Sequence, residues 1–303
     1  MPSASLRVLI LGSNGGLGRS LTRQLAMIGD VVAWTRAELD LMRIEDIGTR
    51  LEAEPFDVLI NPAGITSPDE CAQHPELAKK INTEAPRELA RVCHRMGRRL
   101  IHFSTDYVFD GSKLSPWDED DPTNPINRYG LTKRDGELAV LKACPQALVA
   151  RVSWLFGPDK SSHPDQIIAK ALQSEKLSAI ANKTSSPTFT RDLSDWIQKL
   201  VICHPEVKGI LHLCNQGSAS WRQWGEAALE IANRLGLPVL TQKVSPSALE
   251  NCHFFKDPRP PHTSMSTARF TKLTGISPRP WKDALEEHLH NLHAELAFSS
   301  VPH

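Results

Sequence analysis

The chain has 303 residues, and its 35 Lys and Arg residues balance its 35 Asp and Glu residues. Apolar residues make up 40% and charged residues 23%. This composition excludes a disordered chain, a collagen-like chain and a disulfide-stabilised miniprotein. The zero net charge argues against a nucleic-acid partner, and no apolar run reaches the ~18 residues of a membrane span. At about 150 residues per domain, the length predicts roughly two domains, or one large domain with an appended lobe.

The cysteines and histidines predict neither disulfide bonds nor a metal centre. The six cysteines are scattered, and none forms a Cys-x-x-Cys pair, so we expect free thiols in a reducing compartment. The N-terminal residues lack the charged and apolar regions of a secretory signal, and we therefore expect a cytoplasmic protein. His290 and His293 are three residues apart on a predicted helix. Without a third ligand, no metal ion is expected there.

The first half of the chain alternates short apolar strands with helical patterns. Helices follow the first strand and cover about 44–51, 76–96 and 127–143, while strands are predicted at 6–11, 31–34, 58–60, 100–103 and 147–153. Strands separated by helices are typical of βαβ units. This order predicts an α/β fold with a Rossmann-like, doubly wound parallel sheet. We assign residues 1–155 to this dinucleotide-binding domain.

The second half is interrupted by prolines between positions 187 and 280, which divide it into short pieces. Helices are predicted at 192–202 and 221–235, and strands at 210–213 and 239–244. We expect residues 156–303 to form mainly a smaller substrate-binding lobe. Segments near 190–215 are expected to return to the first domain, which makes the lobe discontinuous.

A glycine-rich turn joins the first predicted strand to the first helix. Gly12 permits the tight turn, Gly15 lets the backbone approach a pyrophosphate, and Gly18 lets the helix pack closely on the strand. Asn14 and Leu17 lie between them and are further candidate cofactor contacts. Free N–H groups at the helix start would face the phosphates. The alternative is an ordinary structural turn between a strand and a helix.

The end of the second predicted strand indicates which nicotinamide cofactor is used. An acidic residue about 20 residues beyond the glycines would bind the ribose hydroxyl of NADH. This chain has Arg36 there, and a guanidinium can bind the 2′-phosphate of NADPH through two hydrogen bonds. NADPH is therefore favoured, with NADH as the alternative. Asp40 and Leu41 are candidate contacts for the adenine.

Tyr129 and Lys133 are four residues apart on the predicted helix 127–143, and so share one face. A neighbouring ammonium stabilises a phenolate, and we therefore expect Lys133 to lower the pKa of Tyr129. Tyr129 could then donate a proton to a carbonyl oxygen near neutral pH. The alternative is a pair of surface residues. The chain has only two tyrosines, and the other, Tyr107, lies in the next motif.

Polar residues follow the third and fourth predicted strands. In open parallel sheets, ligands bind beyond the carboxyl ends of the strands. Ser104, Thr105 and Asp106 follow the strand 100–103, and a hydroxyl there can hydrogen-bond a substrate carbonyl. The alternative is a capped turn. The same rim carries further candidates after the third strand, namely Asn61, Ala63 and Gly64.

These residues together resemble the extended short-chain dehydrogenase/reductase superfamily and, within it, the dTDP-4-dehydrorhamnose reductase family. The resemblance covers nearly the whole chain. Its most specific parts are the string 104–111 and Arg151-Val152-Ser153-Trp154. Other matching segments are the glycine run, 61–66, Ile81-Asn82, Tyr129 to Lys133 with Gly136-Glu137, Ser186-Pro187-Thr188, Asp192-Leu193, and Arg259-Pro260 with Ser264.

The resemblance implies an NADPH-dependent reductase that acts on the C4 carbonyl of a nucleotide-linked 4-keto-6-deoxy sugar, and it suggests a homodimer. It implies that Thr105, Tyr129 and Lys133 form the catalytic triad. Tyr129 would donate the proton, Lys133 would bind the nicotinamide ribose and Thr105 would hold the carbonyl. The remaining candidates are implied to lie along the cofactor (Ala63, Gly64, Asn82, Ser104) or at the substrate (Thr66, Asp106, Tyr107, Trp154, Arg259).

Two departures from the family pattern leave alternatives open. Pro62 replaces an alanine and removes one N–H from the cofactor rim. Ser266 stands where the family has an acidic residue, and the loss of this acid leaves open which nucleotide the substrate carries. A related epimerase or 4,6-dehydratase is one alternative, although the acid that dehydratases carry after the threonine is absent. The other is a non-catalytic protein resembling the regulatory beta subunit of methionine adenosyltransferase, because fold alone does not decide function.

Overall fold

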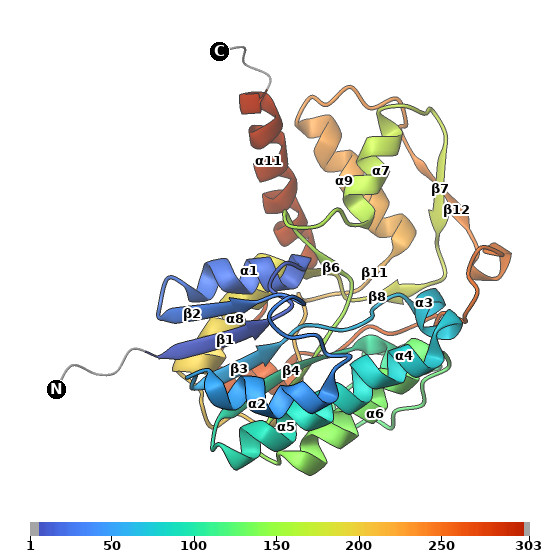
Figure 1. The fold of residues 1–303 in the computed structure, drawn as a ribbon. Coiled ribbons are helices and arrows are strands. Elements are labelled where there is room, and N and C mark those ends of the chain that lie inside the picture. Colours follow the sequence, from blue (N-terminus) through green and yellow to red (C-terminus); the bar gives the residue numbers. More distant parts are fainter. Residues whose placement is uncertain (1–5, 300–303) are drawn as a thin grey trace.

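The computed structural model describes residues 6–299, and a six-stranded parallel sheet lies at its centre (Figure 1). The sheet confirms the predicted doubly wound α/β fold. Its strands are rich in branched apolar residues, as expected for strands that are covered on both faces. In spatial order they are β10 (Gly209–His212), β5 (Leu148–Val152), β4 (Arg99–Thr105), β3 (Val58–Asn61), β1 (Arg7–Leu11) and β2 (Asp30–Trp34).

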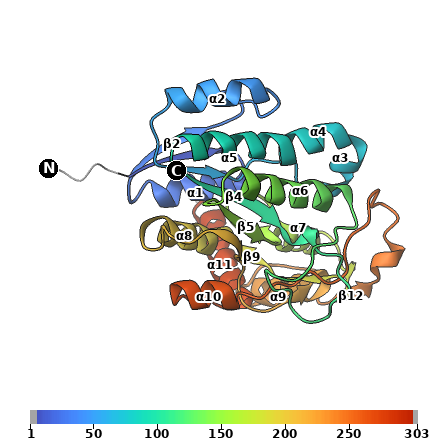
Figure 2. The ribbon, with the colours of Figure 1, turned by 90° about the horizontal axis from the view of Figure 1, so that it is seen from below.

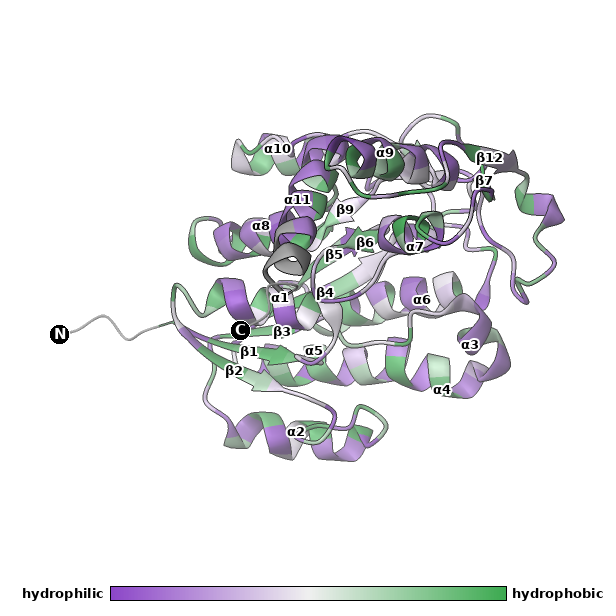
Figure 3. Ribbon diagram, turned by 90° about the horizontal axis from the view of Figure 1, so that it is seen from above, coloured by the Kyte–Doolittle hydropathy of each residue, from purple (hydrophilic) through white to green (hydrophobic). Residues whose placement is uncertain are grey.

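Helices cover the two faces of the sheet and bury a hydrophobic core on each (Figure 2). One face is covered by α2 (Ile44–Ala53), α5 (Ala85–Arg95) and α6 (Arg128–Ala143). The other is covered by α1 (Gly16–Leu25), α8 (Thr190–Ile202) and α10 (Ala268–Thr274). The central strands are hydrophobic, whereas the helices alternate hydrophobic and hydrophilic residues (Figure 3). The alternation follows from helices that pack on the sheet with one side and meet solvent with the other.

A smaller lobe packs around its own hydrophobic core beyond the carboxyl ends of the strands (Figure 1). Its helices are α7 (His163–Ala171), α9 (Trp221–Arg234) and α11 (Trp281–Ser299). Its short strands form three two-stranded sheets that pair β6 (Leu155–Phe156) with β9 (Thr188–Phe189), β7 (Leu177–Ile180) with β12 (Val244–Ser247), and β8 (Thr184–Ser185) with β11 (Ala219–Ser220).

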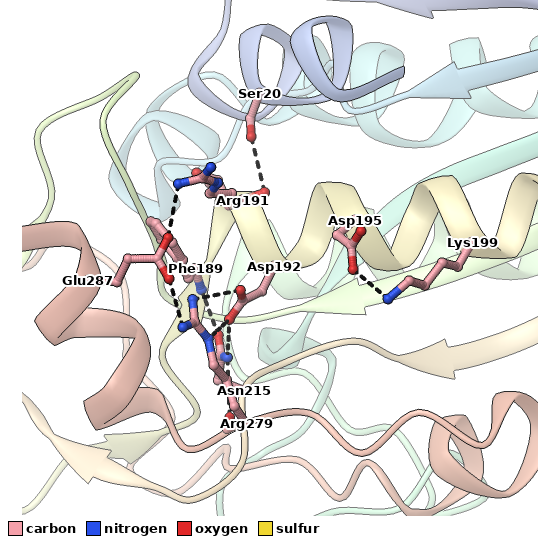
Figure 4. Close-up of polar contacts among 10 residues, drawn as sticks. Ser20, Phe189, Arg191, Asp192, Asp195, Lys199, Asn215, Arg279 and Glu287 are labelled. Carbon is pink, nitrogen blue, oxygen red and sulfur yellow. Dashed lines mark hydrogen bonds and ion pairs between the residues drawn. The ribbon is translucent and has the colours of Figure 1, made fainter. Parts of the chain in front are cut away.

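An ion-pair network fastens the lobe to the start of α8 (Figure 4). Asp192 accepts two hydrogen bonds from the Arg279 guanidinium, both of 2.8 Å, and a third of 2.7 Å from Asn215. Glu287 of α11 pairs with both Arg279 and Arg191. These contacts join α11 to a helix that packs on the sheet, so the lobe is held at the sheet edge.

Two predicted elements differ in the structure. The predicted helix 76–96 is divided into α4 (Pro75–Lys79), a π-helical turn Lys80–Glu84, and α5, with α3 (Pro68–Gln73) before it. The predicted strand 239–244 is wrong, because β12 begins only at Val244. The backbone N–H of Leu240 instead donates to the carbonyl of Ala171 at the end of α7, so this segment forms no strand pair.

None of the helices in the described part of the chain has the length and apolar character needed to span a bilayer. Within residues 6–299, no cluster of three or more His, Cys, Asp or Glu side chains is arranged to hold a metal ion.

Candidate active site

A cleft of about 590 Å³ lies at the carboxyl ends of β1, β3, β4 and β5, below the smaller lobe. This is the position at which open parallel sheets bind their ligands. Most of the predicted site residues meet here. Those that line the cleft are Gly12, Asn14, Gly15, Leu17, Gly18, Ala63, Gly64, Thr66, Ser104, Thr105, Asp106, Tyr107, Tyr129, Lys133 and Trp154.

The glycine-rich turn forms one end of the cleft. Gly12 has a φ of +58°, and its carbonyl accepts the N–H of Gly15 at 3.0 Å. A Cβ atom on Gly18 would lie 2.2 Å from the Gly12 carbonyl oxygen, so only glycine permits this close packing. No side chain caps the N-terminus of α1. The turn therefore leaves backbone N–H groups free to bind the phosphates of a dinucleotide.

We expect Gly18→Ala to lower the free energy of unfolding by about 1–3 kcal/mol, because the new methyl group would push against backbone atoms. NADPH binding should be lost with it. Urea unfolding and the fluorescence of bound NADPH would measure the two effects. Gly48→Ala is the control, because a Cβ there meets only Arg95 at 3.9 Å, and it should stabilise α2 by about 0.5–1 kcal/mol. Unchanged stability and binding in Gly18→Ala would contradict this account of the turn.

Tyr129 lies in the first turn of α6 and is held there by local capping. Asn127 caps the helix by accepting the N–H of Gly130 at 2.7 Å. A Cβ on Gly130 would come 2.0 Å from the Tyr107 carbonyl, so this glycine lets Tyr129 approach the end of β4. The Tyr107 and Tyr129 rings meet edge to face, with centroids 5.7 Å apart. The two tyrosines of the chain thus form one wall of the cleft.

The expected effect of Lys133 on Tyr129 is wrong for this structure. Burial raises the pKa of Tyr129, the nearby Thr105 hydroxyl opposes this rise, and the Asp106 carboxylate adds to it. Lys133 is turned toward the sheet instead, where its Nζ donates to the carbonyl of Phe103 at 2.6 Å. Burial lowers the pKa of Lys133 to about 8. Tyr129 therefore remains a protonated phenol throughout the neutral pH range.

Asp106 organises a buried polar network beside Thr105. Its carboxylate accepts hydrogen bonds from Thr105 at 3.0 Å, from Ser185 at 2.8 Å, and from Thr263. Ser185 and Thr263 come from the smaller lobe, so the network joins the lobe to the end of β4. Lys183, which is fully buried, donates from its Nζ to the carbonyl of Pro260 at 2.6 Å, and this Nζ lies 4.7 Å from the centre of the Tyr107 ring.

Several features of the cleft wall fit a polar ligand. Trp154 has a φ of +41°, a left-handed conformation that is uncommon for a bulky residue and is often found at functional sites. Among residues 6–299, buried polar atoms of Ser104, Trp154 and Thr190 have no hydrogen-bond partner, and all three residues line the cleft. A ligand with polar groups would satisfy them. Together with the glycine-rich turn, this donor set fits a dinucleotide and a polar substrate.

Six predicted site residues do not line the cleft. Arg36 and Asp40 form an exposed ion pair of 3.1 Å just beyond β2, and Leu41 is buried in the adjacent core. The guanidinium of Arg259 pairs with Asp69 at 2.9 Å and packs on the ring of Phe255. The remaining two are the buried side chains of Asn61 and Asn82.

Asn82 supports the cleft from behind. It lies in the π-helical turn, and its amide makes two hydrogen bonds of 2.9 Å with the backbone of Ile65 and one of 3.2 Å with the Thr132 hydroxyl. These bonds hold the loop after β3 against α6, so Asn82 shapes the cofactor side of the cleft without lining it. The π turn accommodates this side chain, which is consistent with the frequent position of such turns at functional sites.

Sequence reasoning missed residues of the loop after β6. Gly157, Asp159, Lys160 and Ser161 line the cleft near the glycine-rich turn. The Gly157-Pro158 pair was a loop signal directly after a parallel strand, and the rule that such loops build the site would have identified them. Lys183 carried no comparable signal, because its burial beside Asp106 depends on the packing of the smaller lobe.

The sheet, the glycine-rich turn and the grouped Thr, Tyr and Lys side chains define an oxidoreductase of the short-chain dehydrogenase/reductase class. The family model "RmlD substrate binding domain" matches residues 6–294. The chain belongs to this family.

Individual relatives agree with this assignment. The chain is 32% identical over 284 residues to the spore coat polysaccharide biosynthesis protein SpsK of Bacillus subtilis, covering 93% of this chain and 96% of that one. It is 28% identical over 295 residues to the dTDP-4-dehydrorhamnose reductase of Escherichia coli, covering 95% and 98%. The solved structure of dTDP-4-dehydrorhamnose reductase from Bacillus anthracis in complex with NADP has a TM-score of 0.87 at 28% identity, covering 95% and 99%.

Proposed function

We propose that the protein uses NADPH to reduce the C4 carbonyl of dTDP-4-dehydrorhamnose, which gives dTDP-L-rhamnose for cell-surface polysaccharide or glycoside biosynthesis. The observation that carries the proposal is that Thr105, Tyr129 and Lys133 line one cleft together with the glycine-rich turn. The family and the reductases among the relatives, one of them solved with NADP, support the same activity.

In this proposal each side chain has one task. Tyr129 donates its phenolic proton to the C4 oxygen, and Thr105 holds that oxygen by a hydrogen bond. Lys133 binds on the nicotinamide side of the cleft. The cofactor, when bound, supplies the hydride. Without the sugar, the Thr105 hydroxyl donates its one proton to Asp106, so it turns that proton to the C4 oxygen when the sugar binds. Thr66, Tyr107 and Trp154 enclose the sugar.

The proposed cofactor contacts follow the cleft toward the exposed end of β2. Free N–H groups of the glycine-rich turn bind the pyrophosphate. Arg36 lies just outside the cleft and binds the 2′-phosphate, with Asp40 and Leu41 at the adenine. Arg36 must then exchange its pair with Asp40 for the phosphate, which carries the larger negative charge.

Arg36→Asp should weaken NADPH binding about 10- to 100-fold relative to NADH, since charge-assisted hydrogen bonds contribute about 1.5–3 kcal/mol. Fluorescence titration with both cofactors would measure the ratio. Arg43→Asp is the matched control, because Arg43 is equally exposed, pairs with Asp46 and undergoes the same change of charge. If the NADPH to NADH ratio changes as much in Arg43→Asp, the 2′-phosphate role of Arg36 is wrong.

The direct test is an assay with purified protein, NADPH and dTDP-4-dehydrorhamnose, followed by the absorbance of the reduced nicotinamide. Oxidation of NADPH with formation of dTDP-rhamnose is the expected result. NADPH binding without turnover would contradict the proposed substrate and favour another keto-sugar or a regulatory role. A relative from Streptomyces antibioticus, 36% identical over 285 residues, is named a probable ketoreductase of a different dTDP-sugar, so its substrate is the natural comparison.

The domain division and the compartment complete the proposal. Residues 1–155, with the segments near 190–215, hold the cofactor, and the rest of residues 156–303 encloses the sugar. The protein acts in the cytoplasm. In support, the six cysteines are free thiols in the structure, as is usual for proteins of reducing compartments.

A further inference from the structure

His102 is a buried titratable residue directly behind the cleft, and the proposed mechanism does not use it. It lies in β4, one residue before Phe103, and is inaccessible to solvent. Its two ring nitrogens face different partners. Nδ1 lies 3.2 Å from the amide nitrogen of Asn61, and Nε2 lies 3.5 Å from the Nζ of Lys133.

The orientation of the Asn61 amide determines which ring nitrogen of His102 carries the proton. The backbone N–H of Ala63 donates to Asn61 Oδ1 at 3.1 Å. Exchanging the amide atoms of Asn61 would place two donors against each other, so Nδ2 must face the imidazole. An amide NH2 group can only donate. Nδ1 of His102 is therefore the acceptor.

The imidazole is neutral, which leaves a single proton for Nε2. Burial holds the pKa of His102 well below its usual range, and the nearby Lys133 charge lowers it further. With Nδ1 acting as the acceptor, the neutral ring carries its N–H on Nε2. This N–H faces Lys133. It repels an ammonium group, which has only donors, and it can donate to the lone pair of a neutral amine.

We propose that His102 is a positioning residue that acts through Lys133: held by Asn61 in its Nε2–H form, it makes the Lys133 ammonium release its proton more readily. The Phe103 carbonyl keeps the amine in place by accepting one hydrogen bond of 2.6 Å. Glu137 on α6 also acts on Lys133, and its negative charge favours the ammonium, so His102 opposes it. Cys71 on α3 would act in the same direction as a thiolate, but burial raises the pKa of this thiol to about 11. This point rests on the proposed function: Lys133 would take up and release a proton near pH 8, within the range in which Tyr129 donates its proton to the sugar.

The tautomer can be measured on the unmodified protein. Histidine labelled with 15N would give the ring-nitrogen signals of His102, identified by their loss in His102→Gln. The expected spectrum between pH 6 and 9 shows Nε2 protonated and Nδ1 unprotonated. A protonated Nδ1 overturns the proposal. This measurement requires neither turnover nor a folded variant other than the one used for assignment.

The effect on Lys133 is measured by titrating protein labelled with 15N at the lysine Nζ, with the Lys133 signal identified in Lys133→Arg. In His102→Phe, which keeps a ring but lacks the N–H, the pKa of Lys133 should rise by about one unit, the scale of one hydrogen bond. His102→Gln can place an N–H near the same position, and the pKa of Lys133 should then return to its wild-type value. Lys183 is an internal control, because burial also lowers its pKa to about 8 but its Nζ bonds to Pro260.

An unchanged Lys133 titration in folded His102→Phe overturns the proposal, as does an equal rise at Lys183. If the protein reduces the sugar, the basic limb of the pH profile of kcat/KM should move with the Lys133 titration. If it reduces no sugar, the two NMR measurements still decide the role of His102, and only the proposed substrate is contradicted.

Discussion

Replacement of Tyr129 by Phe should reduce kcat about 10²- to 10⁴-fold, which is the usual contribution of a general acid. The phenol lies beside the Thr105 hydroxyl, and burial raises its pKa, so it carries its proton throughout the neutral range. Loss of one hydroxyl leaves the ring, its packing on Tyr107 and the glycine-rich turn in place. NADPH binding and the free energy of unfolding should therefore remain close to those of the wild type.

The matched variant is Tyr107→Phe, which removes the other tyrosine hydroxyl of the chain. Tyr107 is placed at the sugar in the proposed function, so we expect this change to raise KM more than it lowers kcat. Steady-state kinetics with NADPH and dTDP-4-dehydrorhamnose would separate the two effects. Equal losses of kcat in both variants, or full activity of Tyr129→Phe, would remove Tyr129 from the role of acid.

Replacement of Arg151 by Met should destabilise the protein by about 3–5 kcal/mol, because it leaves the carboxylate of Glu137 buried without its charge partner. The pair is bidentate, with N–O distances of 2.8 and 2.7 Å, and both side chains are only 2% exposed. It ties β5 to α6 one turn beyond Lys133. Denaturant unfolding would measure the loss.

Two further variants distinguish a buried unpaired charge from a general loss of packing. Arg151→Met combined with Glu137→Leu should recover most of the stability, since apolar residues often replace a buried ion pair at little cost. Arg191→Met, which breaks the exposed pair with Glu287, should cost less than about 1 kcal/mol. A double variant no more stable than Arg151→Met would show that the ion pair is not the cause.

The position of the cleft was predictable from local sequence because its main parts follow from local rules. The spacing of Gly12, Gly15 and Gly18 after an apolar strand predicts a turn that brings backbone N–H groups to the sheet edge. Tyr129 and Lys133 are one helical turn apart, and Thr105 follows a neighbouring strand. Parallel strands place their carboxyl ends together, so these separate signals had to meet at one edge.

The directions and partners of the side chains were not predictable in the same way, because they depend on contacts between distant segments. Lys133 faces His102 and the carbonyl of Phe103 rather than Tyr129, since β4 supplies the nearest acceptor. Asp69 binds Arg259 across 190 residues and keeps it from the cleft. Helical periodicity also cannot distinguish a continuous helix from the π turn around Asn82.

Chain order and residue type thus determined the sheet, the phosphate-binding turn and the residues at the cleft. Tertiary packing decided how those residues are charged and oriented. The physical reason is burial: the pKa values of Tyr129 and Lys133 are shifted mainly by loss of solvent. That loss exists only once the smaller lobe and α6 have closed around the end of the sheet.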